Sequence, residues 1–409
     1  IGDALLMLGK AAEARVEYAA EPAMDFNLTD EQTFVRDVAR KFSNEKLFPR
    51  AGEFDHDAKL DRAVIKEMAE LGLMGVKVPE AYGGAGLDNL AYAISIEELA
   101  RGCASHALVA AVHGSLFAMP ILESGTEEQK RKYLPLVCSG DKMAAYSLSE
   151  AGAGSDAGSL TLTATDDGDS YVLNGTKLWV THGSVAEFVI VFATVNRELK
   201  TKGIAAFIVE ADKQGYQVGK NEVKMGFKAS PTAELIFTDY RVPKANLIGQ
   251  VGRGFNIAME TLNHGRISVG AQSVGMAQRA FEIAARYSLD RKQFGAAIST
   301  FQAIQFKLAD MQAKIHSARL VTYEAAWRKD QGLPVAKNAA IAKMYGSEIG
   351  TQVAHQAIQI LGGFGYTHEY NVERIYRDVR LCEIFEGTNE VQRIVVAREL
   401  LKEAAEAVR

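Results

Sequence analysis

Apolar residues in the first third of the chain, between about residues 29 and 139, recur at the spacing of helices. Thr29 or Asp30 can cap the first of these helices, and its apolar stripe consists of Phe34, Val35, Val38, Ala39 and Phe42. A second helical pattern covers 90–99, and Thr126-Glu127-Glu128-Gln129 resembles a capping box. We therefore expect an all-helical N-terminal domain over residues 24–143.

The period of the hydrophobic pattern shortens after Met143. Short β-rich runs follow at 170–173, 176–180, 188–194, 204–209, 216–218 and 233–237. Asp167-Gly168 and Asn174-Gly175 are dipeptides typical of hairpin turns. Because no long helix interrupts these runs, the pattern predicts an antiparallel sandwich or barrel-like domain over 144–250 rather than βαβ units.

Helical spacing returns after Gly254. It is clearest over 336–361 and in a stripe made of Ile304, Leu308, Met311, Ile315 and Ala318. Long helices joined by short loops predict a four-helix bundle over 251–409. The whole chain is predicted to be an α+β protein with an N-terminal all-α domain, a central antiparallel β domain and a C-terminal bundle. Residues 1–23 precede Met24, which resembles a natural start, and are interpreted as an extension or an expression remnant.

The composition is that of a large globular protein and disfavours several classes. With 409 residues, the chain exceeds the size of about 250–300 residues at which one hydrophobic core stops growing. Acidic residues number 51 and basic residues 46, so no positive excess indicates nucleic acid or a membrane surface. Cys103, Cys138 and Cys382 lack C-x-x-C spacing, and we expect neither disulfides nor a metal site. We also expect no apolar run of the roughly 20 residues that a membrane span needs.

A glycine-rich segment, 146–158, stands where the β pattern begins. Gly152, Gly154 and Gly158, with Ser and Asp between them, can expose backbone N–H groups to a phosphate or to the polar edge of a cofactor. Their spacing is not that of a dinucleotide-binding fingerprint, and no crossover helix follows. Taken alone, the segment is more often an ordinary glycine-rich turn.

Two further segments lie in the C-terminal part. The run 359–366 contains three glycines within four residues, of which a helix C-cap explains one. The run 383–390 places Glu386 between Phe385 and Gly387, just before a helix. A carboxylate in an apolar site has a raised pKa, which suits a general base. Taken alone, Glu386 is more often a glutamate of a surface loop.

Together, these segments resemble the signatures of the acyl-CoA dehydrogenase family of flavoproteins. Ser149-Glu150-x-x-Ala153-Gly154-Ser155-Asp156 is similar to the first signature, and Gln359-x-x-Gly362-Gly363-x-Gly365 with Glu369, Arg374 and Asp378 is similar to the second. The segments 177–181 and 290–295 add to the resemblance, which covers about residues 25–401. It implies the same α–β–α fold and FAD as cofactor.

The resemblance implies α,β-dehydrogenation of an acyl-CoA thioester to the trans-2-enoyl-CoA, with hydride transfer to flavin N5. Glu386 occupies the position of the family's base, which removes the α-proton. Some members carry this base immediately before an arginine that matches Arg266; Gly265 stands there and cannot act as one. Glu386 is therefore the single candidate base.

The resemblance also implies the binding residues. The positions that match flavin contacts are Tyr146, Ser147, Leu148, Ser149, Gly154, Ser155, Trp179, Val180, Thr181, Arg291, Gln302, Gln359, Ile360, Leu361, Gly362, Gly363, Thr388, Asn389 and Glu390. In this family, the Arg291, Gln302 and 359–363 positions contact the FAD of a neighbouring subunit, which implies an oligomer. The positions that match substrate contacts are Ser155, Asn263, His264, Gly265, Arg266 and Gly387.

The substrate and partners are also expectations from the resemblance. Ala107 replaces the arginine with which glutaryl-CoA members bind a distal carboxylate, and 259–266 and 306–311 look most like the short-chain (butyryl-CoA) branch. We expect a short acyl chain, electron-transferring flavoprotein as electron acceptor, and a homotetramer built as a dimer of dimers. The expected location is a bacterial cytoplasm, with the mitochondrial matrix as the alternative. Medium, branched or cyclic acyl-CoA substrates, or a non-enzymatic paralogue, are the alternative functions.

Overall fold

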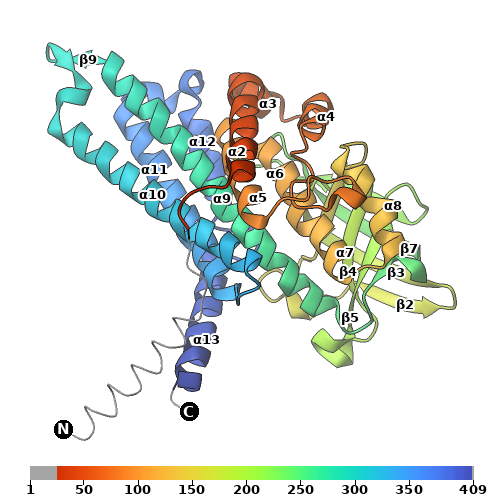
Figure 1. Ribbon diagram of the computed structural model, residues 1–409. Coiled ribbons are helices and arrows are strands. Elements are labelled where there is room, and N and C mark those ends of the chain that lie inside the picture. The colour runs from red at the N-terminus through yellow and green to blue at the C-terminus, as the bar shows by residue number, and fades with distance from the viewer. Residues whose placement is uncertain (1–24, 408–409) are drawn as a thin grey trace, which may run out of the picture.

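The computed structural model describes residues 25–407, and Figure 1 shows helices at one end of the molecule and a sheet at the other. The order of elements is helical, then β, then helical, as the periodicity predicts. The extension 1–23 lies outside the described residues.

The N-terminal part is helical throughout. Its α-helices are α2 (Asp30–Phe42), α3 (Ala51–Asp57), α4 (Arg62–Glu70), α5 (Asn89–Gly102), α6 (Ala104–Ala111), α7 (Ala118–Ser124) and α8 (Glu127–Cys138), and shorter helical turns are η1 (Ser43–Leu47), η2 (Phe48–Arg50), η3 (Glu80–Tyr82) and η4 (Val112–Phe117). Thr29 and Thr126 cap α2 and α8, and in both helices a glutamine at the third position completes a capping box. The prediction for the apolar stripe was wrong at Phe34, which is 71% exposed.

The central part is one sheet whose strands are mostly antiparallel. Its strands are β1 (Ala144–Ser147), β2 (Thr163–Asp167), β3 (Ser170–Thr181), β4 (Phe188–Thr194), β5 (Ile204–Glu210), β6 (Tyr216–Asn221), β7 (Thr232–Pro243) and β8 (Leu247–Ile248), in the order β6-β7-β3-β2-β4-β5-β8 with β1 beside β4. The pairs β1–β4 and β2–β4 are parallel.

The predicted turn at Asn174-Gly175 was wrong, because both residues lie inside β3. The ladder between β3 and β7 continues past them with a register shift between Leu173 and Gly175. Gly175 has a φ of +139° and packs so closely on Leu162 that a Cβ would lie 3.0 Å from the Leu162 Cα. This glycine therefore makes a bulge rather than a hairpin.

Side chains alternate along β4 and join the sheet to the helices. Ile190 and Phe192 belong to a core shared with Phe117 and Ile121 of the N-terminal helices. The intervening residues 189, 191 and 193 belong to the core between the strands. The sheet therefore has one face covered by helices, as α7 and α8 show in Figure 1.

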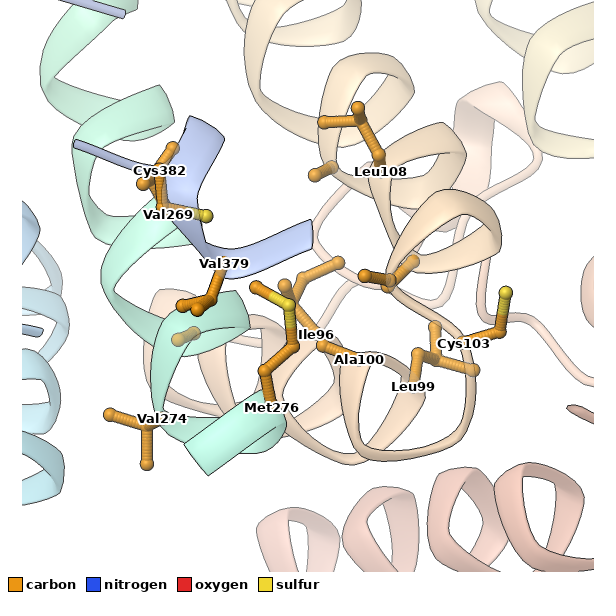
Figure 2. Close-up of a cluster of buried hydrophobic side chains, with 14 of the residues drawn as sticks. Ile96, Leu99, Ala100, Cys103, Leu108, Val269, Val274, Met276, Val379 and Cys382 are labelled. Carbon is orange, nitrogen blue, oxygen red and sulfur yellow. The ribbon is translucent and has the colours of Figure 1, made fainter. Parts of the chain in front are cut away.

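The C-terminal part contains the longest helices. They are α9 (Gly254–Asp290), α10 (Gln302–Asp330), α11 (Ala336–Leu361), α12 (Val372–Leu381) and α13 (Asn389–Ala407), with the small hairpin β9 (Lys292–Gln293) and β10 (Ala296–Ala297) between α9 and α10. Figure 2 shows Ile96 of α5 close to Met276 of α9, and Val269 of α9 and Val379 of α12 belong to the same hydrophobic core. The two helical parts thus share one core, and the boundaries 24–143, 144–250 and 251–409 remain our proposed division by type of element.

One expectation about apolar runs was wrong. Within residues 25–407, the segment Ala104–Ser124 has the length and composition of a membrane span, with a mean hydropathy of 1.5. The protein itself buries 89% of this window, and its residues contribute to the cores described above. The count of hydrophobic residues alone does not distinguish a buried core helix from a span.

Candidate active site

Glu386 lies in the short segment between α12 and α13, and this segment is tightly turned. Glu386 and Gly387 both have positive φ, +53° and +88°. The left-handed conformation is unfavourable for a glutamate, by of order 1–3 kcal/mol, and persists only where its surroundings impose it. Here the side-chain amide of Gln392 donates to the carbonyl oxygens of Glu386 (3.3 Å) and Gly387 (2.9 Å).

The carboxyl group of Glu386 faces inward without a hydrogen-bond partner. The residue as a whole is half-buried, but its Oε2 atom has no solvent contact and no partner among the described residues. Burial raises the pKa of Glu386 to about 7, although the positive charges of Lys343 and Arg266 act in the opposite direction. A carboxyl group with this pKa can hold a proton or release it at neutral pH, as a general base must.

Gly265, on α9, makes room for this carboxyl group. A Cβ at Gly265 would collide with Glu386 Oε2 and lie 3.0 Å from Leu116. The structure thus brings the predicted base and the position of the alternative base into direct contact, although they lie far apart in the sequence.

Two further polar atoms close to Glu386 lack partners. Arg266 is buried, and its side chain donates to Asn263 Oδ1 (2.9 Å), but its Nε has no partner among the residues described. The hydroxyl of Tyr146, from β1, is likewise buried and unpaired. The charge of Glu386 contributes to the pKa of both side chains, which places them around the carboxyl group. Buried polar atoms without partners in a folded protein indicate a ligand or water.

The glycine-rich segment between β1 and β2 is held by a buried ion pair. Glu150 accepts hydrogen bonds from Lys177 Nζ (2.8 Å), Thr161 N (2.6 Å) and Leu162 N (3.0 Å). Lys177 also donates to the carbonyl oxygen of Leu148 (2.9 Å), and Leu178 N donates to that of Ser149 (2.9 Å). The backbone on both sides of Ser149 is therefore fixed to β3.

A bulge in β3 turns Trp179 out of the sheet. The register with β7 shifts between Lys177 and Val180, and Trp179 has a φ of +60° with 62% of its surface exposed. The neighbouring Val180 is buried and Thr181 is half-buried. A strained, exposed tryptophan beside the Ser149 segment offers an aromatic edge to a bound group.

These features fit a flavin. The Tyr146 hydroxyl and the Ser147 Oγ are buried without partners among residues 25–407. A Cβ at Gly154 would meet nothing within 4 Å, and the same holds for Gly362 and Gly363, so these backbones are open to a ligand. Leu148 is buried and Ser155 is exposed. Tyr146–Ser149 and Trp179–Thr181 are the residues that would hold the isoalloxazine ring.

The remaining predicted FAD residues form a second group, far from Glu386. Arg291 directly follows the last residue of α9, and Gly265 and Arg291 are roughly 39 Å apart along the helix axis, since a helix rises 1.5 Å per residue. The Arg291 guanidinium lies over the ring of Phe364 (5.8 Å), which follows Gly362-Gly363. Gln302 and Gln359 are exposed at the same end, where Ile360 and Leu361 are buried.

Several predicted contact residues already have partners within the chain. His264 is buried between Glu123 (Nε2, 2.9 Å) and Lys77 (Nδ1, 3.1 Å). Thr388 accepts from Val391 N (3.3 Å) at the start of α13, where Glu390 is exposed. Asn389 is 3% exposed, with its side chain directed to α11. Their roles toward cofactor or substrate stay predictions.

The sequence reasoning missed Lys343, which lies near Glu386. Lys343 is fully buried in α11. The sequence did contain a signal for it: Lys343 stands in an apolar helical stripe beside Ala339, Ala340 and Ala342. A lysine in such a stripe is expected to have a specific partner, because a lysine is seldom buried without one.

Within residues 25–407 there is no group of three or more metal-ligating side chains.

Comparison with known proteins adds to this geometry. Models of the N-terminal, middle and C-terminal domains of acyl-CoA dehydrogenases match residues 29–141, 145–240 and 252–401. The short-chain specific acyl-CoA dehydrogenase of Bos taurus mitochondria is 50% identical over 375 residues, 92% of this chain and 91% of the bovine one.

Two solved structures are similar over their full length. Butyryl-CoA dehydrogenase from Megasphaera elsdenii has a TM-score of 0.91 and 44% identity, covering 92% of this chain and 100% of its own. A chain from a study of the electron transferring flavoprotein of Acidaminococcus fermentans has a TM-score of 0.91 and 46% identity, with the same coverage.

The chain belongs to the acyl-CoA dehydrogenase family. It is therefore an FAD-dependent oxidoreductase that acts on CH–CH bonds, as the sequence predicts.

Proposed function

We propose that the enzyme converts a short-chain acyl-CoA thioester to the trans-2-enoyl-CoA with Glu386 as the base. The observation that carries this proposal is the buried, unpartnered Oε2 of Glu386, whose pKa lies near 7. A base that is half-protonated near neutral pH and shielded from water can take the weakly acidic α-proton of a thioester. FAD, when bound, supplies N5 as the acceptor of the β-hydrogen as hydride.

The chain's own residues have distinct tasks in this reaction. Glu386 takes the α-proton, and Gly265 leaves space for its carboxyl group. Arg266 contributes a buried positive charge that stabilises the ionised base. Tyr146 and Ser147 present unpaired hydroxyls to the bound groups. Glu150 and Lys177 hold the backbone around Ser149 in place.

The proposal of a short acyl chain draws on relatives and on the N-terminal core. The bovine relative is described as short-chain specific, and the Megasphaera structure is a butyryl-CoA dehydrogenase. Ala107 is completely buried in α6 and offers no charge to a distal carboxylate. Medium, branched or cyclic acyl-CoA is the alternative substrate class.

For partners, we propose electron-transferring flavoprotein as acceptor and a homotetramer, a dimer of dimers. The first has support from the structural relative studied together with such a flavoprotein. The second has support from the distance of roughly 39 Å along α9 between Gly265, which lies beside Glu386, and Arg291, because Arg291 and Gln302 can then serve the site of another subunit. We propose a role in fatty acid β-oxidation in a bacterial cytoplasm; the bovine relative is mitochondrial, and the matrix is the alternative location.

A chain-length series tests this function. Purified enzyme is assayed with acyl-CoAs from butyryl to palmitoyl, with electron-transferring flavoprotein as acceptor, beside the Glu386→Gln variant. We expect the highest kcat/KM at butyryl-CoA and about a 10³-fold lower kcat for Glu386→Gln, with FAD retained. A maximum at lauroyl-CoA or longer rejects the short-chain assignment, and near-normal flavin bleaching by Glu386→Gln rejects the base.

A further inference from the structure

Lys343 is a buried cation that the chemistry above does not use. Its side chain is fully buried in α11, and its Nζ donates to the side-chain oxygen of Asn389 (2.9 Å). That oxygen belongs to a neutral amide and not to a carboxylate. Burying an ammonium group costs free energy unless other groups compensate for its lost hydration. The buried position of Lys343 therefore requires an explanation.

Asn389 connects this lysine to the segment that carries Glu386. The Asn389 side chain also contacts Ser347 Oγ (3.1 Å) and Glu348 Oε1 (3.2 Å) of α11. Its backbone N–H donates to the carbonyl oxygen of Glu383 (3.0 Å). A second hydrogen bond to α11 comes from Thr351, whose Oγ1 donates to Glu383 Oε1 (2.6 Å). The segment 383–389 is therefore fastened to α11 at both ends, by Glu383 and by Asn389, with Glu386 in the middle.

The charged and titratable groups around Glu386 come from five elements or segments. Lys343 of α11 and Arg266 of α9 are positive, and both lower the pKa of the carboxyl group. Tyr146 of β1, Tyr92 of α5 and Cys382 after α12 also sense the charge of Glu386; burial raises the pKa of each, so all three are neutral at pH 7. Burial lowers the pKa of Lys343 to about 8, so the lysine is mostly protonated at pH 7.

We propose that Lys343 is a positioning residue that, through Asn389, helps to fix the 383–389 segment and supplies a buried positive charge to the Glu386 carboxyl group. This inference rests on the proposed function, in which Glu386 is the base. Without the ammonium group, only Arg266 opposes the effect of burial, which favours the protonated carboxylic acid, and this form cannot accept a proton.

Infrared pH titration of the FAD-loaded protein tests the proposal without relying on turnover. The C=O stretch of the protonated Glu386 carboxyl is identified by its absence in Glu386→Gln. In Lys343→Met we expect the titration midpoint to rise by roughly one pH unit or more, because a nearby opposite charge lowers a carboxyl pKa by about 1–3 units. The acidic limb of the pH profile of kcat/KM is expected to move to higher pH by the same amount. Lys343→Arg keeps a positive charge and is expected to retain the wild-type midpoint.

Matched variants separate charge from folding. Lys337→Met removes another α11 lysine, which pairs with Glu403, and is expected to leave the midpoint unchanged. Asn389→Ala keeps the Lys343 ammonium group but removes its hydrogen-bond partner. This variant should raise the titration midpoint by less than Lys343→Met does, and it replaces Lys343→Met as the test if that variant does not fold. An unchanged midpoint in whichever of these two variants is measured overturns the inference. If Glu386→Gln loses turnover in that case, the proposed function still stands.

Discussion

At the scale of single residues, the Glu386 carboxyl group depends on the absence of a side chain at Gly265. A Cβ there would occupy the place of Oε2 and lie 2.9 Å from the carboxyl carbon. The atoms that it meets are the far end of a flexible side chain, so the carboxyl group can move away and α9 can stay in place. Alanine also favours a helix interior over glycine by about 1 kcal/mol. The substitution should therefore spare stability and affect chemistry.

We expect Gly265→Ala to lower kcat at least tenfold, because the added Cβ would displace Glu386 from the position in which we propose that it takes the proton. FAD content and the thermal midpoint should remain those of the wild type. The measurement is steady-state kinetics with the flavin absorbance and melting temperature as controls. A kcat equal to that of the wild type would show that the carboxyl group tolerates the shift.

At the scale of elements, the turn between β1 and β2 is held by the ion pair of Glu150 and Lys177. Both side chains are buried, with 6% and 0% exposed. Burial raises the pKa of Glu150, but the charge and hydrogen bond of Lys177 and the donors of the 161–162 segment bring the pKa below its ordinary value. Removing one partner leaves an uncompensated buried charge, which lowers stability by about 3–5 kcal/mol. Removing both partners leaves no such charge and is expected to cost less.

We expect Lys177→Met to loosen the segment at its anchor. The amides of Thr161 and Leu162, which donate to Glu150, should exchange on the order of 100-fold faster, corresponding to about 3 kcal/mol. Hydrogen exchange measures this directly, and FAD affinity should fall in parallel. The double variant Lys177→Met/Glu150→Gln is the control and should recover part of the loss. Unchanged exchange at both amides would mean that the pair does not hold the segment.

At the scale of the whole molecule, the hairpin β9–β10 presents an apolar side chain at the same end as Arg291. Phe294, in that hairpin, is 97% exposed and has a φ of +50°. We propose that Phe294 lies at a contact between subunits. In the proposed tetramer, this contact would also complete the FAD site.

We expect Phe294→Asp to reduce the oligomer to smaller species and to weaken FAD retention, because a carboxylate at the contact must be desolvated. Light scattering after size exclusion and the flavin-to-protein absorbance ratio measure the two effects. Phe34→Asp, on α2, is a control with a similarly exposed phenylalanine (71%) and should change neither. A full-size, FAD-loaded Phe294→Asp protein would contradict the proposed role of the hairpin.

Much of the fold followed from local signals. The capping boxes at Thr29 and Thr126 were recognisable because a cap is a contact between residues three apart. The wrong turn at Asn174-Gly175 shows the limit: whether a glycine makes a hairpin or a bulge depends on the partner strand β7. Phe34 was misplaced for the same reason, since helical periodicity does not say which stripe a neighbour covers.

The sequence by itself determined the α–β–α order and, through a family resemblance, indicated the flavin and Glu386 as the candidate base, because periodicity and motif spacing are properties of the chain. Only the tertiary structure decided that Gly265 lies against Glu386 and that the charge of Lys343 acts on it. It also decided that His264 and Asn389 are held by partners within the chain. A pKa near 7 is likewise absent from the sequence. It arises from burial and from the charges of Lys343 on α11 and Arg266 on α9, which come close to Glu386 only once the chain has folded.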